Sequence, residues 1–323
     1  MTSDGGSTAS VNTAPPGPIT LSQSATLVSD PDDEIFFLYT RLATLKPADS
    51  SDTGHFHGLG SENSNQDALL VRIELKPPTT CELQRNTETG NQRRKRRKGG
   101  GVQKAKDERG GRDPIVLEYV LLQDKTALRS RSGDTGSVLW KTSIEFLSLV
   151  LQQRHFPERR RGLFDYEKLS QAHVLELGAG TGLLALALSP FVRKYTATDI
   201  PALVPLLRKN ILSAPASAPV TVAALDWTLP ALRQVDVGST DAPDVLLVVD
   251  CVYHPALVRP LLTTLTALAT PQHTAAVVVV ELRAEDVLRE FLQEWIALGW
   301  RVWSVGEDLL GARWGMWVGW RET

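Results

Sequence analysis

The fold of this chain is decided by residues 173–188, HVLELGAGTGLLALAL. The run 173–177 predicts a buried strand, and the apolar run 183–188 that follows predicts a helix. Between them the glycines fall at every second position, which allows positive φ angles and lets a ligand approach the backbone closely. The start of the helix supplies free N–H groups for polar ligand atoms. The segment therefore predicts a strand–loop–helix unit that binds a ligand at its loop.

The sequence downstream repeats this alternation of strands and helices. Apolar helical runs separate further strand-like runs at 194–199, 219–226, 244–250, 275–282 and 300–305, and residues 312–320 alternate like a last strand in a hairpin. Near-continuous apolar strands separated by helices are typical of a parallel sheet covered on both faces. We therefore expect an α/β fold with a doubly wound, mostly parallel seven-stranded sheet. Its ligand should lie beyond the carboxyl ends of the strands.

The region before Gly136 has a different character. Residues 1–30 are rich in Ser, Thr, Gly and Pro, so we expect a disordered tail. Residues 31–135 form an N-terminal extension with a short amphipathic helix from Asp33 and two strand-like runs that predict a β-hairpin, 68–75 and 114–123. The domain expected to carry the activity spans residues 136–323.

The predicted hairpin encloses a basic, low-complexity loop at about residues 84–112, which contains RRKRRK from Arg93 to Lys98. Adjacent cations repel one another and bury nothing, so a solvated loop is one interpretation. The alternatives are a contact with RNA or the ribosome and a nuclear-import signal.

Composition narrows the class of protein. The 323 residues carry a net charge of −2, which argues against binding to nucleic acid by overall charge alone. Cys81 and Cys251 are far apart and form neither a disulfide framework nor a zinc spacing. The chain has no secretory leader pattern and no apolar run long enough for a membrane span. We expect a monomer without a metal, in the cytoplasm, with the nucleus as the alternative.

The glycine loop favours one kind of nucleotide ligand. A dinucleotide site requires G-x-G-x-x-G, and the carboxylate of Glu176 would repel a pyrophosphate. The same carboxylate suits the ammonium group of a methionine moiety, and no lysine follows the loop as in a P-loop. Glu176 and the loop residues Gly178, Ala179 and Gly180 therefore favour S-adenosyl-L-methionine over NAD.

Three further positions are candidates for the same cofactor. Asp199 ends the next strand, where a carboxylate accepts hydrogen bonds from both ribose hydroxyls; a helix N-cap is the alternative. Asp226 and Trp227 end the third strand, where they could bind the adenine amino group and cover the ring, with core packing as the alternative for the indole. Trp140 could close the cavity from the other side, or pack in the core.

The segment Asp250-Cys-Val-Tyr253 ends the fourth strand, beside the loop, where an acceptor would meet the methyl group. A carboxylate there can orient an amine, and an aromatic ring can stabilise a methylated cation and exclude water. Asp250 and Tyr253 are therefore the candidate catalytic residues. Cys251 lacks flanking partners that would make it a nucleophile. Glu281 and Arg283 either line the acceptor mouth or form a structural ion pair.

On these residues the chain resembles the class I methyltransferases of the lysine-specific methyltransferase 16 family, and within it the fungal ribosomal lysine methyltransferases. The matching blocks are VLW (138–140), LELGAGTG (175–182), TD (198–199), LRKNI (207–211), LDW (225–227), VVDCVYHPALVRPLL (248–262) and LRAEDV (282–287). The resemblance implies cofactor contacts at Trp140, the loop glycines, Asp199, Trp227 and Val249. It also implies that the substrate is a lysine on a large-subunit ribosomal protein.

The sequence thus predicts a protein-lysine N-methyltransferase that uses S-adenosyl-L-methionine. Two alternatives stay open. Methylation of another protein or of a nucleic-acid base is one, although the fourth strand lacks the Asn-Pro-Pro-Tyr type of motif. A catalytically silent, ribosome-associated module that only binds the cofactor is the other, and the intact loop glycines, Asp199 and Asp250 argue against it.

Overall fold

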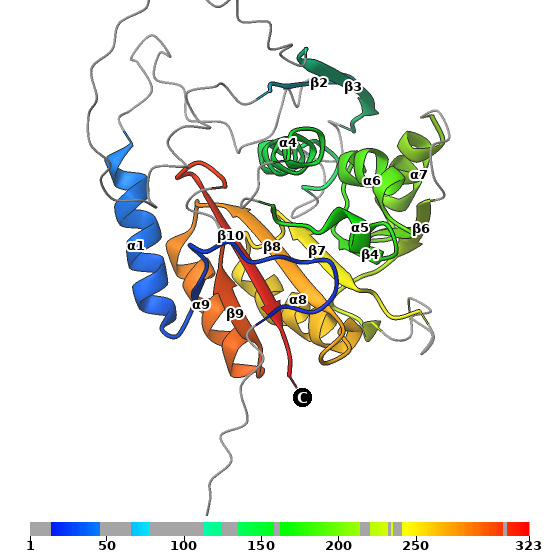
Figure 1. Cartoon of the computed structure of the whole chain (residues 1–323). Helices are drawn as coiled ribbons and strands as arrows, with labels where there is room; N and C mark the ends of the chain where they lie inside the picture. Colours follow the sequence, from blue (N-terminus) through cyan, green and yellow to red (C-terminus); the bar gives the residue numbers. More distant parts are fainter. Residues whose placement is uncertain are drawn as a thin grey trace, which may run out of the picture.

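The computed structural model describes residues 14–45, 66–77, 113–124, 135–157, 162–213, 220–231, 234, 241–305 and 309–322. Its strands are β1 (Thr26–Leu27), β2 (Ala68–Leu75), β3 (Ile115–Leu122), β4 (His173–Leu177), β5 (Lys194–Asp199), β6 (Val220–Ala224), β7 (Val245–Val249), β8 (Ala275–Glu281), β9 (Arg301–Ser304) and β10 (Trp314–Trp320). Its helices are α1 (Pro31–Thr44), α4 (Lys141–His155), α5 (Tyr166–Leu169), α6 (Leu183–Leu188), the 3₁₀ turn η1 (Ser189–Phe191), α7 (Val204–Ser213), α8 (Pro255–Leu268) and α9 (Glu285–Ala297). Figure 1 shows the arrangement of these elements.

The central sheet has the strand order β1-β9-β10-β8-β7-β4-β5-β6, in which β4 to β8 run parallel and β10 is antiparallel to both of its neighbours. The order reverses at β4, whose parallel neighbours are β5 and β7. In that register Glu176 pairs with both Ala197 and Leu247. The carboxyl ends of the three strands therefore meet at one edge, which is where a doubly wound sheet holds its ligand.

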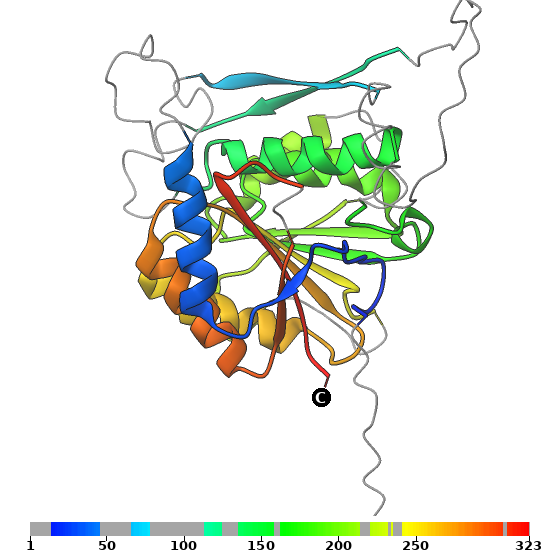
Figure 2. The same cartoon turned by 60° about the vertical axis from the view of Figure 1, so that its left-hand side comes forward.

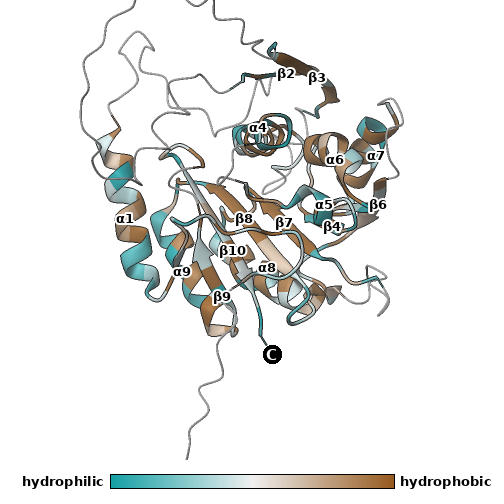
Figure 3. Ribbon diagram, in the orientation of Figure 1, coloured by the Kyte–Doolittle hydropathy of each residue, from teal (hydrophilic) through white to brown (hydrophobic). Residues whose placement is uncertain are grey.

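Both faces of the sheet are covered, as the apolar strands predict. Side chains alternate between two core clusters: Val174 and Leu247 face the α4 and α6 side, whereas Leu175 and Leu246 face the α8 and α9 side. The hydropathy of the ribbon in Figure 3 follows this arrangement, with the central strands hydrophobic along their length. The predicted doubly wound, mostly parallel α/β fold is confirmed.

The predicted hairpin is present as β2 and β3, paired in antiparallel register from Ala68↔Leu122 to Leu75↔Ile115. Figure 2 shows it lying over α4, so that α4 separates it from the sheet. Alternate side chains of β2 are buried against this layer. At one end the Gln152 side chain of α4 bonds the backbone N and O of Lys76, at 3.1 and 2.6 Å. At the other end Asn210 of α7 bonds the backbone of Leu122.

One expectation needs correction. Residues 14–30 belong to the predicted disordered tail, yet they pack on the domain. Ile19 is buried in the main core and forms a bridge with Phe164, and β1 pairs antiparallel with β9 as an eighth strand. A two-residue strand leaves no periodic pattern, and the surrounding Ser, Thr and Pro residues suggested disorder.

Some expectations fall outside the described residues. Residues 1–13 of the predicted tail and the basic run Arg93 to Lys98 are among them. In the part of the chain that the structure describes, every helix is too short or too polar to cross a membrane.

Candidate functional site

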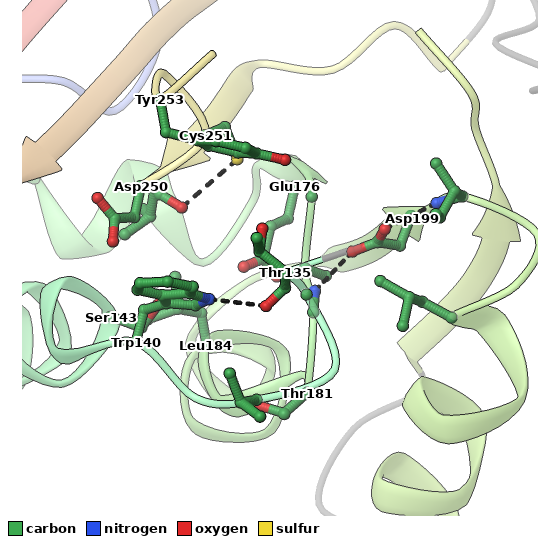
Figure 4. A pocket seen from close by; sticks show the side chains of 18 of the residues that line it. Thr135, Trp140, Ser143, Glu176, Thr181, Leu184, Asp199, Asp250, Cys251 and Tyr253 are labelled. Carbon is green, nitrogen blue, oxygen red and sulfur yellow. Dashed lines mark hydrogen bonds between the residues drawn. The ribbon is translucent and has the colours of Figure 1, made fainter. Parts of the chain in front are cut away.

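A cavity opens beyond the carboxyl ends of β4, β5 and β7 (Figure 4). Its lining contains every site residue predicted from the sequence: Trp140, Glu176, Gly178, Ala179, Gly180, Asp199, Asp226, Trp227, Val249, Asp250 and Tyr253. In Figure 4 Asp199 lies at one side of the cavity, Asp250 and Trp140 lie at the opposite side, and Glu176 lies between them. The structure therefore brings these residues together around one space, with an aspartate at each end and Trp140 beside Asp250.

The glycine loop has the backbone that its sequence predicts. Gly178, Gly180 and Gly182 have φ angles of 72°, 53° and 84°, which side chains rarely tolerate. A Cβ atom at Gly178 would lie 2.6 Å from the Cys251 sulfur, and one at Gly180 would lie 3.0 Å from the carbonyl oxygen of Gly136. Glycine is thus required both by conformation and by close packing on either side of the loop.

Glu176 is the last residue but one of β4 and is buried beside the cavity. Its side chain is almost inaccessible, with 3% relative exposure, and its Oε2 accepts a 2.8 Å hydrogen bond from the Tyr195 hydroxyl. Burial raises the pKa of Glu176 to about 8, and the nearby Asp199 carboxylate adds to the increase, while the bond from Tyr195 opposes it. A ligand cation beside this carboxyl would reverse the effect of burial by stabilising its ionised form.

Asp199 connects the end of β5 to the glycine loop. Its two oxygens accept hydrogen bonds from the backbone N–H groups of Gly180 and Ile200, each at 2.7 Å. The first helical residue beyond it is Val204, so Asp199 does not cap α7 in the manner considered from the sequence. Each carboxylate oxygen can accept a second hydrogen bond. Two backbone N–H groups therefore fix the Asp199 carboxylate at the edge of the cavity.

Asp226 and Trp227 form the wall beyond β6. Asp226 accepts hydrogen bonds from the backbone N and the hydroxyl of Thr228, at 2.9 and 2.6 Å, which fixes a local turn. Trp227 is half-buried against the core and also lines the cavity. A Cβ at Gly178 would lie 3.3 Å from its ring. Trp227 thus packs on the core and also forms part of the cavity wall, and its cover of an adenine ring stays a prediction.

Trp140 stands at the N-terminal end of α4, where it occupies the N-cap position without a side-chain capping bond. Its indole N–H donates a 2.9 Å hydrogen bond to the Thr135 carbonyl, as Figure 4 shows. The segment from Thr135 to Trp140 consequently folds back on itself and forms one wall of the cavity.

Asp250 follows β7 with a φ angle of 60°, a left-handed conformation that is uncommon for residues other than glycine. Its side chain is only 5% exposed, and its Oδ2 atom lies 2.8 Å from the Arg283 guanidinium. Burial raises the pKa of Asp250, and the charge and hydrogen bond of Arg283 oppose that rise. The ion pair proposed from the sequence for Glu281 and Arg283 is present, at 2.6 Å, and it includes Asp250.

Cys251 sits beside Asp250 but has a different environment. Its sulfur donates to the Leu177 carbonyl at 3.2 Å. Burial and the surrounding carboxylates raise the pKa of this thiol well above its usual range. Since the thiolate is the nucleophilic form, this environment agrees with the expectation that Cys251 is not a nucleophile.

Sequence reasoning missed several residues of the lining, among them Thr135, Gly136, Ser143, Thr228 and Leu257. Gly136 is the most informative of them. A Cβ there would lie 2.5 Å from the Leu203 side chain and 3.5 Å from a carboxylate oxygen of Asp199. The only available signal was a glycine just before the VLW block, because the contact depends on tertiary packing.

Comparison with known proteins gives a family match over the region that builds this site. A family model described as lysine methyltransferase matches residues 123–295. This stretch covers more than half of the chain, and it includes every cavity residue named above.

Individual relatives match over about half of this chain. The ribosomal lysine N-methyltransferase 5 of Eremothecium gossypii is 32% identical over 226 residues, which cover 55% of this chain and 71% of the relative. The human protein-lysine N-methyltransferase EEF2KMT is 30% identical over 46% of this chain and 45% of its own length. A Schizosaccharomyces pombe protein named diaminohydroxyphosphoribosylamino-pyrimidine deaminase is 33% identical over 57% of this chain, and the chain spans only 42% of that protein.

Proposed function

Because the chain belongs to the lysine methyltransferase family, we propose that it transfers a methyl group from S-adenosyl-L-methionine to a lysine side chain of another protein. The observation that carries this proposal is the cavity itself. One end has a rigid carboxylate, Asp199, next to a bare glycine backbone, and the other end has Asp250 and Tyr253. This arrangement suits a nucleoside ligand whose sugar binds beside Asp199 and whose reactive group lies beside Asp250 and Tyr253.

The residues present fit the proposed cofactor. Asp199 would hold the ribose hydroxyls, and Trp227 with Asp226 would hold the adenine. Glu176 would hold the ammonium of the methionine part. The same buried carboxylate would repel the pyrophosphate of a dinucleotide. Trp140 and the backbone of Val249 would close the space around the sulfur. When bound, S-adenosyl-L-methionine supplies an electrophilic methyl group on a sulfonium centre.

The acceptor end has to receive an uncharged amine. A lysine with its ordinary pKa of about 10.4 requires about 4.6 kcal/mol to lose its proton at pH 7. The Asp250 carboxylate would accept an N–H of the amine and align its lone pair, and the Tyr253 ring would exclude water and stabilise the methylated cation. Alignment of the amine within the cavity would supply much of the acceleration. Asp250 and Tyr253 are therefore the proposed catalytic residues.

We assign the substrate class from the relatives' names and from the sequence. The Eremothecium protein is a ribosomal lysine N-methyltransferase, and the basic run Arg93 to Lys98 suits a contact with the ribosome or RNA. A lysine of a large-subunit ribosomal protein, methylated in the cytoplasm, is thus the proposed target.

The test is methyl transfer to protein. Purified chain is incubated with methyl-labelled S-adenosyl-L-methionine and an extract from cells that lack it, and protein and RNA fractions are separated. Label should enter a protein band, and mass spectrometry should place it on lysine. Label in RNA alone would replace the proposal with base methylation. Binding of S-adenosylhomocysteine with no label in either fraction would favour a silent binding module.

Cofactor binding should depend on pH through Glu176. The pKa of this carboxyl is about 8 in the ligand-free protein, and the ligand's ammonium favours its ionised form, so binding below pH 8 must release a proton. The dissociation constant of S-adenosylhomocysteine should therefore rise as pH falls, approaching tenfold per unit. Calorimetry at pH 7 in two buffers of different ionisation enthalpy measures the proton release directly.

Glu176→Gln is the matched variant for this experiment, because it keeps the side-chain shape and removes the titration. Its binding should be weaker than wild type at pH 8 and should release no proton at pH 7. If the wild-type protein and Glu176→Gln release the same number of protons, another group is responsible and Glu176 does not hold the ammonium.

A further inference from the structure

Arg283, just after β8, makes three contacts at the acceptor end. Its guanidinium lies 2.8 Å from the Asp250 carboxylate and 2.6 Å from the Glu281 carboxylate. It also stacks over the Trp140 ring, 4.9 Å from the centroid. A planar guanidinium can satisfy two carboxylates at its edge and an aromatic ring on its face at the same time, which an ammonium group cannot do.

Two of these three contacts are with residues that line the cavity, and these two residues come from different parts of the fold. Asp250 comes from the end of β7 and Trp140 from the start of α4. Arg283 itself is not among the lining residues, and its side chain keeps 29% exposure. Arg283 therefore acts on the cavity through its neighbours and is not placed to touch the cofactor.

The Asp250 carboxylate is held from two directions. Arg283 donates to Oδ2, and the backbone N–H of Glu281 lies 3.3 Å from Oδ1. The backbone of Asp250 is in the left-handed region, which the surrounding contacts must maintain. A carboxylate with 5% exposure also requires a nearby cation to remain ionised. Removing the guanidinium would therefore affect both the orientation and the charge of Asp250.

We propose that Arg283 is a positioning residue, which fixes Asp250 and Trp140 relative to each other so that the acceptor lysine meets a rigid, ionised carboxylate. This inference rests on the proposed methyl transfer. It predicts that loss of Arg283 damages turnover far more than cofactor binding, because the proposed cofactor contacts at Asp199, Glu176 and the glycine loop do not involve Arg283, and Trp140 is the single proposed cofactor contact that it touches.

Arg283→Gln should lower kcat roughly 10- to 100-fold, with the dissociation constant of S-adenosylhomocysteine changed less than about twofold. Arg283→Lys should recover part of kcat, because it restores the charge without the stacked, two-carboxylate geometry. The matched control is Arg289→Gln, which removes an arginine of α9 that pairs with Asp32 and Glu285 on the surface. It should leave kcat unchanged. Equal losses in kcat and cofactor affinity for Arg283→Gln would overturn the proposal in favour of a general structural role.

A pH profile shows whether Arg283 supports the rate through its charge or only through its packing. The charged groups acting on Asp250 are Glu281 at the end of β8 and Arg283 just after it. The other titratable groups that line the cavity are Cys251 and Tyr253 on the same segment as Asp250, Glu176 of β4, Asp199 of β5, and Asp226 beyond β6. Without Arg283 the pKa of Asp250 should rise, so its ionised fraction declines sooner as the pH falls. The ratio of Arg283→Gln to wild-type rates should therefore fall with decreasing pH, and this ratio cancels the titration of the acceptor amine. A constant ratio would contradict the ionisation part of the proposal.

Different results would refute the proposed methyl transfer and the proposed role of Arg283. If wild-type protein transfers no methyl group, the proposed function fails, and the Asp250–Arg283–Trp140 contacts are then examined by NMR. Arg283→Gln should move the Asp250 carboxyl titration to higher pH and shift the Trp140 indole resonance. Both signals unchanged would show that Arg283 positions neither residue, whatever the activity.

Discussion

Asp250→Asn is expected to lower methyl transfer by about 100-fold or more while the dissociation constant of the cofactor stays within about twofold. The asparagine keeps the size of the side chain and tolerates the left-handed backbone that Asp250 adopts, at a φ angle of 60°. It removes the negative charge that would align the acceptor amine. The loss should therefore appear in kcat measured with a lysine substrate.

Binding of S-adenosylhomocysteine to the same variant, measured by calorimetry, provides the internal control. Asp286→Asn is the external one, because Asp286 is an exposed acid in the first turn of α9. It should leave both quantities unchanged. An equal loss of transfer and cofactor affinity in Asp250→Asn would assign Asp250 to the cofactor, and undiminished transfer would remove it from catalysis.

Asp199→Ala is expected to weaken cofactor binding by roughly 10- to 150-fold, which corresponds to the loss of about 1.5–3 kcal/mol from hydrogen bonds to a charged group. The reason is twofold. The carboxylate would no longer receive the ribose hydroxyls, and the glycine loop would lose the bond from Gly180 N–H to Asp199. The dissociation constant of S-adenosylhomocysteine measures the effect.

The matched control for this variant is Asp244→Ala. Asp244 also accepts a backbone N–H, from His173 at 2.7 Å, but at the opposite end of the same sheet. Both variants should lose some thermal stability, whereas only Asp199→Ala should lose cofactor affinity. If Asp244→Ala weakens binding equally, the effect at Asp199 comes from general destabilisation of the sheet.

The proposed cofactor end of the site was predictable because its residues follow regular elements. Glu176 and Asp199 each lie at the carboxyl end of a buried apolar strand, and parallel strands bring such ends together. The residue type and spacing of the loop glycines predict their positive φ angles. The alternation of apolar strands and helices was thus sufficient to place these residues at one edge of the sheet.

The acceptor end was harder to predict, because its geometry depends on contacts between distant segments. The sequence suggested an ion pair between Glu281 and Arg283, but nothing in it indicated that the guanidinium also stacks on Trp140. The left-handed backbone of Asp250 could likewise not be predicted from the sequence, since aspartate usually adopts a negative φ angle. Such features arise from tertiary packing and leave no periodic signal.

The most direct test of the account is a crystal structure with S-adenosylhomocysteine bound. The ligand should lie along the Glu176–Gly182 loop, with its ribose hydroxyls on Asp199 and its sulfur toward Asp250 and Tyr253. A ligand bound elsewhere, or with its sulfur directed away from Asp250, would contradict the assignment of this cavity to methyl transfer.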